Sequence, residues 1–287
     1  MKRFNTITII GVGLIGGSVG LAIKKRKLAK EVVGVFRRAS TMRRALKRKA
    51  IDKGTLSIEE GVASADLIII TTPVHLIPDM ARQASAYAKP GAVITDAGST
   101  KQWIVGKIEK LVARKPGLFF VGSHPMAGSE HAGVEFATDG LMAGSPCIVT
   151  KTRRTDRAAL DKVARFWKAL GARVKVMSPA DHDRSVSLVS HLPHVVAFSL
   201  AGAVPAQDLA YAAEGFKDTT RVASSDPALW ADIFLTNRKE VVKACRAFEK
   251  YYAKVVAALA KGNYRRTVQV LGYAKSKRDR FIHAKGA

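Results

Sequence analysis

Residues 7–16 read Ile7-Thr8-Ile9-Ile10-Gly11-Val12-Gly13-Leu14-Ile15-Gly16, and this stretch decides the fold of the 287-residue chain. An apolar run leads directly into a Gly-x-Gly-x-x-Gly turn, and a helix-length segment follows. In the dinucleotide-binding fingerprint the glycines permit a tight turn, close approach of the pyrophosphate, and close packing of helix on strand. We therefore predict a nucleotide site built on Gly11, Gly13 and Gly16, with Leu14 and Ile15 at the amide-rich helix start.

The end of the second predicted strand distinguishes between cofactors. An NAD site places an acidic residue there, about 20 residues beyond the glycines, to hold the ribose hydroxyls. Phe36 occupies that position, and Arg37, Arg38 and Ser40 follow. Because guanidinium groups suit a 2′-phosphate, this pattern favours NADP, with NAD as the alternative if the arginines belong only to the basic surface. We also assign Thr72 and Pro73, just past the third predicted strand, to the cofactor site.

Short apolar runs alternate with helix-length amphipathic segments through the first 178 residues. The predicted strands are Thr6–Ile10, Glu31–Val35, Leu67–Thr71, Ala92–Thr95, Phe119–Val121, Cys147–Thr150 and Arg173–Met177. The clearest helices between them are Leu76–Ala88 and Lys101–Ala113. Such alternation is typical of a mostly parallel sheet covered on both faces, so we predict an α/β Rossmann-type domain over residues 1–178.

The pattern changes after Ser178-Pro179, a pair that predicts a helix start with a serine cap and proline in the first turn. Helical patterns then run to the end of the chain, over Asp181–Ala203, Pro227–Ala260 and Tyr264–His283. The last two carry an apolar stripe on an otherwise basic surface. We predict that residues 179–287 form an all-α substrate and dimerisation domain that pairs with a second copy.

Composition narrows the class of protein. The two cysteines, Cys147 and Cys245, make no disulfide framework and fit a reducing cytoplasm. No Cys/His spacing suits zinc, so we predict no metal. The formal net charge is +25, but lysines and arginines recur along the whole chain without a stacking motif. This favours a solvated surface that attracts anionic ligands over a nucleic-acid site.

The amino-terminal apolar run superficially resembles a secretory signal, with Met1-Lys2-Arg3 before it. Five glycines interrupt the run, and the basic residues 24–27 end it. No uninterrupted apolar stretch is long enough to cross a bilayer, so we predict no membrane partner.

Residues 123–130 read Ser-His-Pro-Met-Ala-Gly-Ser-Glu and supply a candidate base. His124 lies just past the predicted strand that ends at Val121, and Pro125 stops that strand from continuing. Ligands of open α/β sheets bind at the carboxyl ends of the strands. Because imidazole accepts a proton near neutral pH, His124 is a candidate general base, with a solvated loop histidine as the alternative.

Three more stretches accompany the glycine turn and the His124 stretch. They are Asp96-Ala97-Gly98-Ser99-Thr100-Lys101, Ser190-His191-Leu192-Pro193-His194, and Phe216-Lys217-Asp218-Thr219-Thr220-Arg221 with Trp230 beyond. In this order, along nearly the whole chain, they closely resemble the prephenate/arogenate dehydrogenase family of tyrosine biosynthesis. The resemblance implies oxidative decarboxylation of a cyclohexadienol dicarboxylate, with hydride transfer to NADP or NAD, and a two-domain dimer.

Such a reaction needs an acceptor for the ring hydroxyl proton, cations for carboxylates, and a dry pocket. By resemblance, His124 is the acceptor. Ser99 orients His124 or the substrate, or it caps the helix that starts at Lys101, and both roles are compatible. Arg221 is the carboxylate clamp, since its planar fork suits bidentate binding.

The remaining candidate substrate residues each have a structural alternative. Lys217 assists Arg221 or pairs with Asp218. His194 is favoured by the resemblance over His191, which lies one turn earlier. The others are Ser190, a weaker candidate for the same pocket; Glu130, which orders the cations or touches the substrate side chain; and Trp230, which closes the pocket or packs at an interface.

Two rival classes stay open at this point. Another Rossmann dehydrogenase with a helical second domain, such as a hydroxyacid dehydrogenase or imine reductase, has no reason for the His-Pro-Met-Ala-Gly stretch. A basic nucleotide-sensing or nucleic-acid-binding module predicts retention on a polyanion and no turnover. No single residue distinguishes prephenate from arogenate.

Overall fold

The computed structural model describes residues 3–128 and 131–286. The chain divides into two compact units, Met1–Arg238 and Lys239–Ala287. The larger unit therefore includes helices beyond residue 178 as well as the nucleotide-binding turn. The predicted domain boundary at residue 178 stays a prediction.

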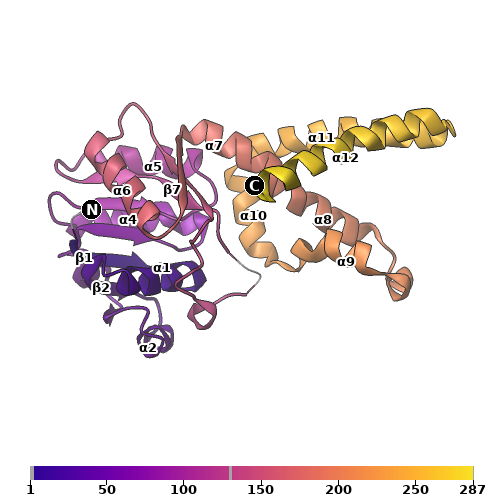
Figure 1. The fold of residues 1–287 in the computed structure, drawn as a ribbon. Helices are drawn as coiled ribbons and strands as arrows, with labels where there is room; N and C mark the ends of the chain where they lie inside the picture. The colour runs from indigo at the N-terminus through magenta and orange to yellow at the C-terminus, as the bar shows by residue number, and fades with distance from the viewer. Residues whose placement is uncertain (1–2, 129–130, 287) are drawn as a thin grey trace. The chain divides into compact units, whose positions relative to one another are not determined.

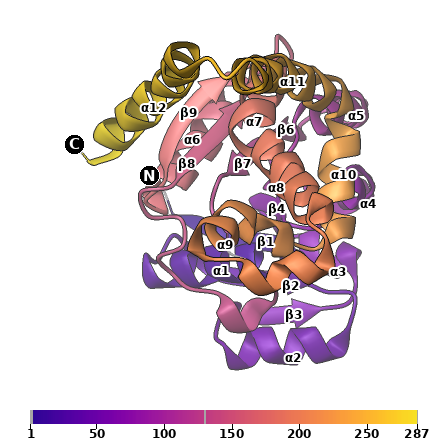
Figure 2. The same ribbon diagram turned by 90° about the vertical axis from the view of Figure 1, so that its right-hand side faces the viewer.

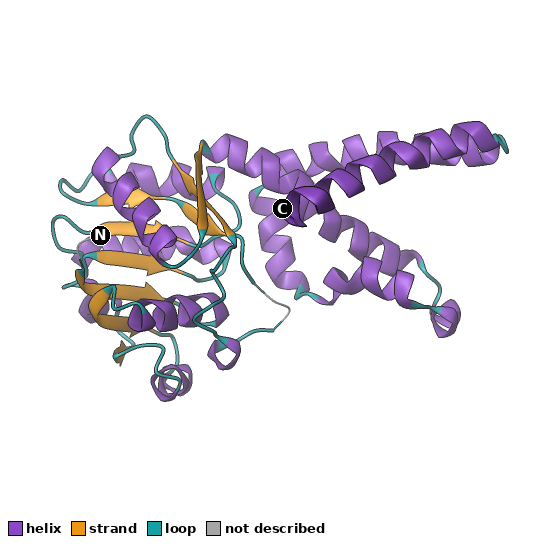
Figure 3. Cartoon of the chain, viewed as in Figure 1, coloured by secondary structure: helices purple, strands orange, loops and turns teal. Residues whose placement is uncertain are grey.

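A six-stranded sheet forms the centre of the larger unit, in the order β3-β2-β1-β4-β5-β6 with every neighbouring pair parallel (Figures 1 and 3). Its strands are β1 (Phe4–Ile10), β2 (Ala29–Val35), β3 (Lys53–Thr55), β4 (Leu67–Ile70), β5 (Val93–Asp96) and β6 (Phe119–Val121). The parallel Rossmann-type sheet predicted from the sequence is confirmed. The edge strand β3, three residues long and largely polar, was not predicted.

Alternate side chains of the strands feed two separate cores. Ile9 and Ile69 pack on one face and Ile10 and Ile70 on the other, all at most 2% exposed. The helices of the Rossmann part are α1 (Leu14–Lys25), α2 (Ala39–Lys47), α3 (Ile58–Val62), α4 (Ile77–Tyr87), α5 (Gln102–Val112) and α6 (Arg157–Ala169). Residues of α1 and α6 join the first core, and residues of α3, α4 and α5 join the second. The sheet is therefore covered on both faces, as its largely apolar central strands require.

A second, three-stranded sheet holds the candidate base. It comprises β7 (Ser123–Pro125), β8 (Pro146–Thr150) and β9 (Arg173–Met177), with β7 antiparallel to β8 and β8 parallel to β9. The last two predicted strands therefore do not extend the main sheet. His124 lies just past β6, as predicted, but within β7 and opposite Ile148, so the alternative of a solvated loop histidine was wrong.

The helical part of the larger unit begins as predicted. Ser178 caps α7 (Pro179–Val186) by accepting a hydrogen bond from the Asp181 amide at 3.0 Å. A π-helical turn, Ser187–His191, joins α7 directly to α8 (Leu192–Ala203). Short 3₁₀ segments, α9 (Glu214–Thr220) and α10 (Pro227–Thr236) follow, and Figure 2 shows these elements from the side.

Two predictions about the helical half need correction. The predicted helix over residues 227–260 breaks at Asn237, which is 4% exposed and has non-helical dihedral angles. The continuous helix Pro179–Ala203 is long and apolar enough, by length and composition alone, to cross a membrane. It also carries the buried polar residues His182 and Asp183, which contact His124 and the Lys101 amide in the Rossmann part.

The smaller unit consists of α11, which begins at Arg238 and ends at Ala260, and α12 (Tyr264–Gly286). Gly262 takes a positive φ of 57° in the connection, a conformation that favours glycine. The Tyr251 hydroxyl donates a hydrogen bond to the carbonyl of Val270 at 2.8 Å, which joins the two helices.

Candidate active site

The glycine turn lies between the carboxyl ends of β1 and β4, where the strand order of the sheet reverses. Gly11 has a φ of +91°, and a Cβ there would lie 2.9 Å from Thr72 Cγ2. A Cβ on Gly16 would lie 2.5 Å from Thr71 Oγ1, so helix and strand pack too closely for a side chain. By contrast, no described atom lies within 4 Å of a Cβ on Gly13. The backbone at Gly13 is therefore open to a ligand.

Two further features of this turn fit a dinucleotide. Helix α1 begins at Leu14 without a side-chain cap, so the first amides, including that of Ile15, face outward at the positive end of the helix. The Thr72 hydroxyl is buried beside Gly11 and has no hydrogen-bond partner among the described residues. An orphaned hydroxyl next to an open backbone cradle fits a polar cofactor. Pro73, the next residue, is exposed.

The end of β2 carries cations and no carboxylate. Phe36 is 7% exposed, and its ring lies over Gly34, so this side chain belongs to the core. Arg37, Arg38 and Ser40 are exposed where the chain turns into α2.

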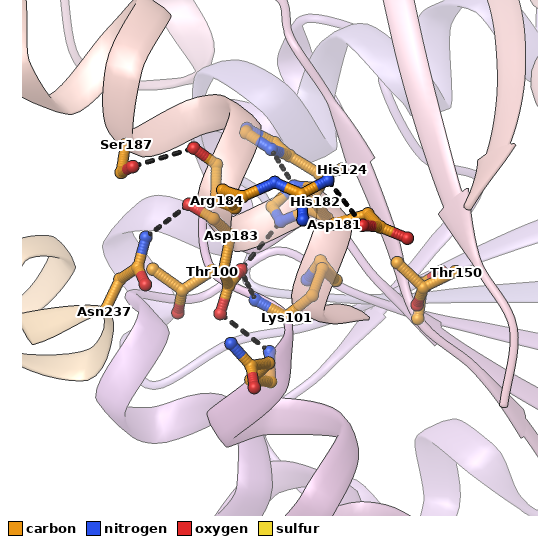
Figure 4. A network of polar contacts seen from close by, with 12 residues as sticks. Thr100, Lys101, His124, Thr150, Asp181, His182, Asp183, Arg184, Ser187 and Asn237 are labelled. Carbon is orange, nitrogen blue, oxygen red and sulfur yellow. Dashed lines mark hydrogen bonds and ion pairs between the residues drawn. The ribbon is translucent and has the colours of Figure 1, made fainter. Parts of the chain in front are cut away.

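His124 is buried in β7, with 8% of its surface exposed. Its Nδ1 lies 2.8 Å from Nε2 of His182, a residue of α7, and the two rings meet edge to face (Figure 4). Nδ1 is thereby engaged, which makes Nε2 the ring nitrogen available to a ligand.

His182 is held in turn by Asp183. Nδ1 of His182 lies 2.7 Å from Oδ1 of Asp183, and both residues are buried. The same carboxylate accepts the backbone amides of Lys101 (2.7 Å) and Gln102 (2.9 Å) at the start of α5. Asp183 therefore caps α5 from another helix. The predicted cap by Ser99 was wrong, because α5 takes no side-chain cap from its own flank; Ser99 itself is half-buried in the loop after β5.

A buried ion pair, Lys101 with Asp96, lies next to the two histidines in the hydrogen-bond network. Lys101 and Asp96 are fully buried, and the Lys101 ammonium donates to Oδ2 of Asp96. The amides of Gly98 (2.9 Å) and Ser123 (3.1 Å) also donate to the Asp96 carboxylate. The pair thus ties the end of β5 to the first residue of β7, one position before His124.

Burial and nearby cations keep the two histidines neutral. Burial lowers the pKa of His124 well below its ordinary 6.5, and His182, Lys101 and His191 lower it further. Burial, Lys101 and His191 lower the pKa of His182 to about 2. A neutral His124 with one free ring nitrogen is chemically a proton acceptor.

The network continues toward the aromatic residues of α8 and α10. The Asn237 side-chain amide donates to the backbone carbonyl of Asp183 at 2.9 Å and lies 3.3 Å from Nδ1 of His191. The His194 ring stacks on Trp230 with centroids 3.4 Å apart. Burial lowers the pKa of His194 and the positive charge of Arg221 lowers it further, while the hydrogen bond to the Ser190 carbonyl acts in the opposite direction.

The structure describes two of the three other predicted substrate residues. Lys217 pairs with Glu214 at 3.1 Å, so the predicted pairing with Asp218 was wrong. Ser190 is half-buried, and its carbonyl accepts a hydrogen bond from His194 Nδ1 at 2.9 Å. Glu130 lies outside the described residues.

Sequence reasoning missed His182, Asp183 and the pairing of Lys101 with Asp96. Asp96 and Lys101 are the first and last residues of the quoted Asp96–Lys101 stretch, and this was the only sequence signal for their pairing. His182 and Asp183 stand in the second turn of a helix whose start was predicted, but nothing in their spacing points to His124, 58 residues earlier.

A dinucleotide turn at the reversal of a parallel sheet, together with a buried, neutral histidine just past the end of another strand, is typical of a Rossmann-type oxidoreductase. Two family models match the chain: the prephenate dehydrogenase nucleotide-binding domain over residues 19–176 and the prephenate dehydrogenase dimerization domain over residues 178–273. The chain belongs to the prephenate dehydrogenase family.

Relatives in sequence and structure agree with this assignment. The chain is 38% identical to a prephenate dehydrogenase of Bacillus subtilis, over 83% of this chain and 66% of that protein. It is 34% identical to a cyclohexadienyl dehydrogenase of Zymomonas mobilis, over 91% and 90% of the two chains. The crystal structure of the Aquifex aeolicus prephenate dehydrogenase, in complex with hydroxyphenyl propionate and NAD⁺, superposes with a TM-score of 0.90 at 34% identity, covering 98% of this chain and 99% of that one.

Proposed function

We propose that this protein catalyses the oxidative decarboxylation of prephenate, arogenate or both in tyrosine biosynthesis. His124 takes the proton of the ring hydroxyl at Nε2. The nicotinamide, when bound, would accept the hydride from the carbinol carbon. The ring carboxylate departs as CO₂ as the ring becomes aromatic, and His124 returns its proton to the phenolate oxygen. The observation that carries the proposal is a buried, neutral His124 whose Nδ1 contacts His182 and whose Nε2 has no hydrogen-bond partner among the described residues.

Substrate binding is assigned to the residues beyond His124. Arg221 clamps a carboxylate with its planar fork, and His194 and Trp230 form an aromatic and polar wall beside it. Ser99 hydrogen-bonds at the reacting centre. Lys217, Ser190 and Glu130 are weaker assignments, which rest on the resemblance alone.

The cofactor assignment has a general and a specific part. Gly11, Gly13, Leu14, Ile15, Gly16, Thr72 and Pro73 hold the dinucleotide. We infer a preference for NADP over NAD because Phe36 replaces the carboxylate that would hold the ribose hydroxyls, while Arg37, Arg38 and Ser40 are exposed at the same strand end. The Aquifex relative binds NAD⁺, which makes this preference a distinguishing claim about the present chain.

A two-by-two assay tests the function. Purified protein is given prephenate or arogenate with NAD or NADP, and reduction of the nicotinamide is followed by absorbance. We expect turnover with at least one substrate, and a higher kcat/KM with NADP than with NAD. Absence of turnover in all four combinations would refute the proposed function.

The domain match and the two cysteines support proposals about assembly and location. The helical region matches a dimerization-domain model, and we infer a homodimer formed through it. Cys147 and Cys245 are free, which suits a reducing cytoplasm.

A further inference from the structure

We propose that His182 and Asp183 are positioning residues that hold His124 in the tautomer whose Nε2 lone pair faces the substrate. The inference rests on the proposed function for its kinetic consequence. Its structural content, the placement of two protons along the chain Asp183–His182–His124, is independent of which substrate binds.

The placement begins at Asp183. Backbone amides donate to both of its oxygens, one to Oδ1 and one to Oδ2. These amides open α5, so the positive end of that helix also favours the ionised carboxylate. Burial raises the pKa of Asp183, while the two amides and Lys101 act in the opposite direction. An ionised carboxylate accepts hydrogen bonds only, so the third contact, from His182 Nδ1, is an N–H donor.

The positions of the protons on His182 and His124 follow by exclusion. A neutral histidine that carries its proton on Nδ1 has an acceptor at Nε2. The contact of 2.8 Å to His124 therefore requires the proton on Nδ1 of His124. Nε2 of His124 is then left with a lone pair and no proton, as proton uptake from the ring hydroxyl demands.

The same series of hydrogen bonds stabilises protonated His124, the product of that proton transfer. When the hydroxyl proton binds to Nε2, His124 becomes an imidazolium that still donates from Nδ1 to His182. The negative charge nearest to it along the hydrogen bonds is the Asp183 carboxylate. All three residues are at most 8% exposed, so these interactions act with little solvent screening. Lys101 and His191 lower the pKa of both histidines, and the Asp183 carboxylate acts in the opposite direction once His124 carries a positive charge.

Two substitutions of His182 separate positioning from packing. His182→Phe keeps an aromatic ring of similar shape but removes the acceptor for His124 Nδ1. His182→Gln loses the ring but offers a side-chain carbonyl near the position of Nε2. Positioning predicts that the phenylalanine variant loses on the order of 10²-fold in kcat with little change in KM, and that the glutamine variant recovers most of that loss. A packing role predicts the reverse order.

The second readout is spectroscopic and needs no turnover. In protein labelled with ¹⁵N-histidine, long-range ¹H–¹⁵N correlations distinguish protonated from unprotonated ring nitrogens, and a His124→Asn sample assigns the His124 signals. We expect Nε2 of His124 to be unprotonated in the wild type and mixed in His182→Phe. A protonated Nε2 in the wild type, or His182→Phe at least as active as His182→Gln, would overturn the inference. Wild-type protein that shows the expected tautomer without oxidising either substrate would refute the proposed function alone.

Discussion

At the scale of single residues, burial in a short strand that ends at a proline gives His124 the properties of a proton acceptor. His124 sits in a three-residue strand, and Pro125 closes that strand opposite Cys147. Removal from water lowers its pKa, and three neighbouring cationic or potentially cationic groups lower it further. Desolvation alone would only make a weak base; the bond to His182 also selects which nitrogen is basic.

Replacing His124 by asparagine removes the proton acceptor and keeps a small polar side chain. We expect kcat to fall by roughly 10²–10⁴-fold, the usual contribution of a general base, while the dissociation constant for the cofactor stays within about twofold. Single-turnover rates and cofactor titration measure the two quantities. Equal losses in both would indicate a structural role for this residue instead.

The pH profile of the wild type checks the same assignment. His124 works only when neutral, and its pKa is lowered from 6.5, so kcat/KM should stay level down through pH 6.5 and fall only below it. An acid limb centred above pH 6.5 would contradict a buried, neutral base.

Arg37 and Arg38 define the third prediction at residue scale. Changing both to alanine should raise the KM for NADP far more than that for NAD, because the 2′-phosphate is the only group that distinguishes the two cofactors. The matched control is the double change of Arg153 and Arg154, which are exposed in the loop after β8. It removes the same charge from a chain of net charge +25. Equal effects of the two double variants on the KM for NADP would mean that Arg37 and Arg38 act only through the overall positive charge of the surface.

At the scale of elements, periodicity predicted the local structure well and the long-range pairing less well. The largely apolar run at β1 and the continuous apolar run at β4 indicate strands buried on both faces, and Ser178-Pro179 marks a helix start that the structure confirms. The short polar β3 has no such signal. The break at Asn237 also escaped prediction, because asparagine is tolerated within a helix and ends this one where its amide contacts Asp183 and His191.

The candidate site shows the same division. The glycine turn is predictable because strand, turn and helix are adjacent in the sequence. The chain from His124 to Asp183 is not, because it depends on how α7 packs against α5 and β8. Asp183 links these facts: by capping α5 it fixes α7 against the Rossmann part, and the same carboxylate orients His182.

At the scale of the whole molecule, exposed apolar side chains on the helices require a partner surface. On α11, Phe248, Tyr252, Val256 and Leu259 recur every three or four residues and are 38–59% exposed. With 3.6 residues per turn this spacing makes one continuous stripe. Apolar stripes of this length are typical of protein interfaces, and a second copy of the chain is the partner that the dimerization-domain match supports.

Charges placed in that stripe should separate the copies. We expect wild-type protein to sediment at twice the 30.9 kDa mass of the chain, and Tyr252→Asp with Val256→Asp to shift it toward the monomer. Lys250→Asp with Lys254→Asp is the control, because these lysines lie two positions before Tyr252 and Val256 and therefore on roughly the opposite side of the helix. The control should stay dimeric although it changes the net charge more. A monomeric wild type, or equal dissociation of both double variants, would remove the stripe from the interface, and circular dichroism of each variant shows whether the helices remain folded.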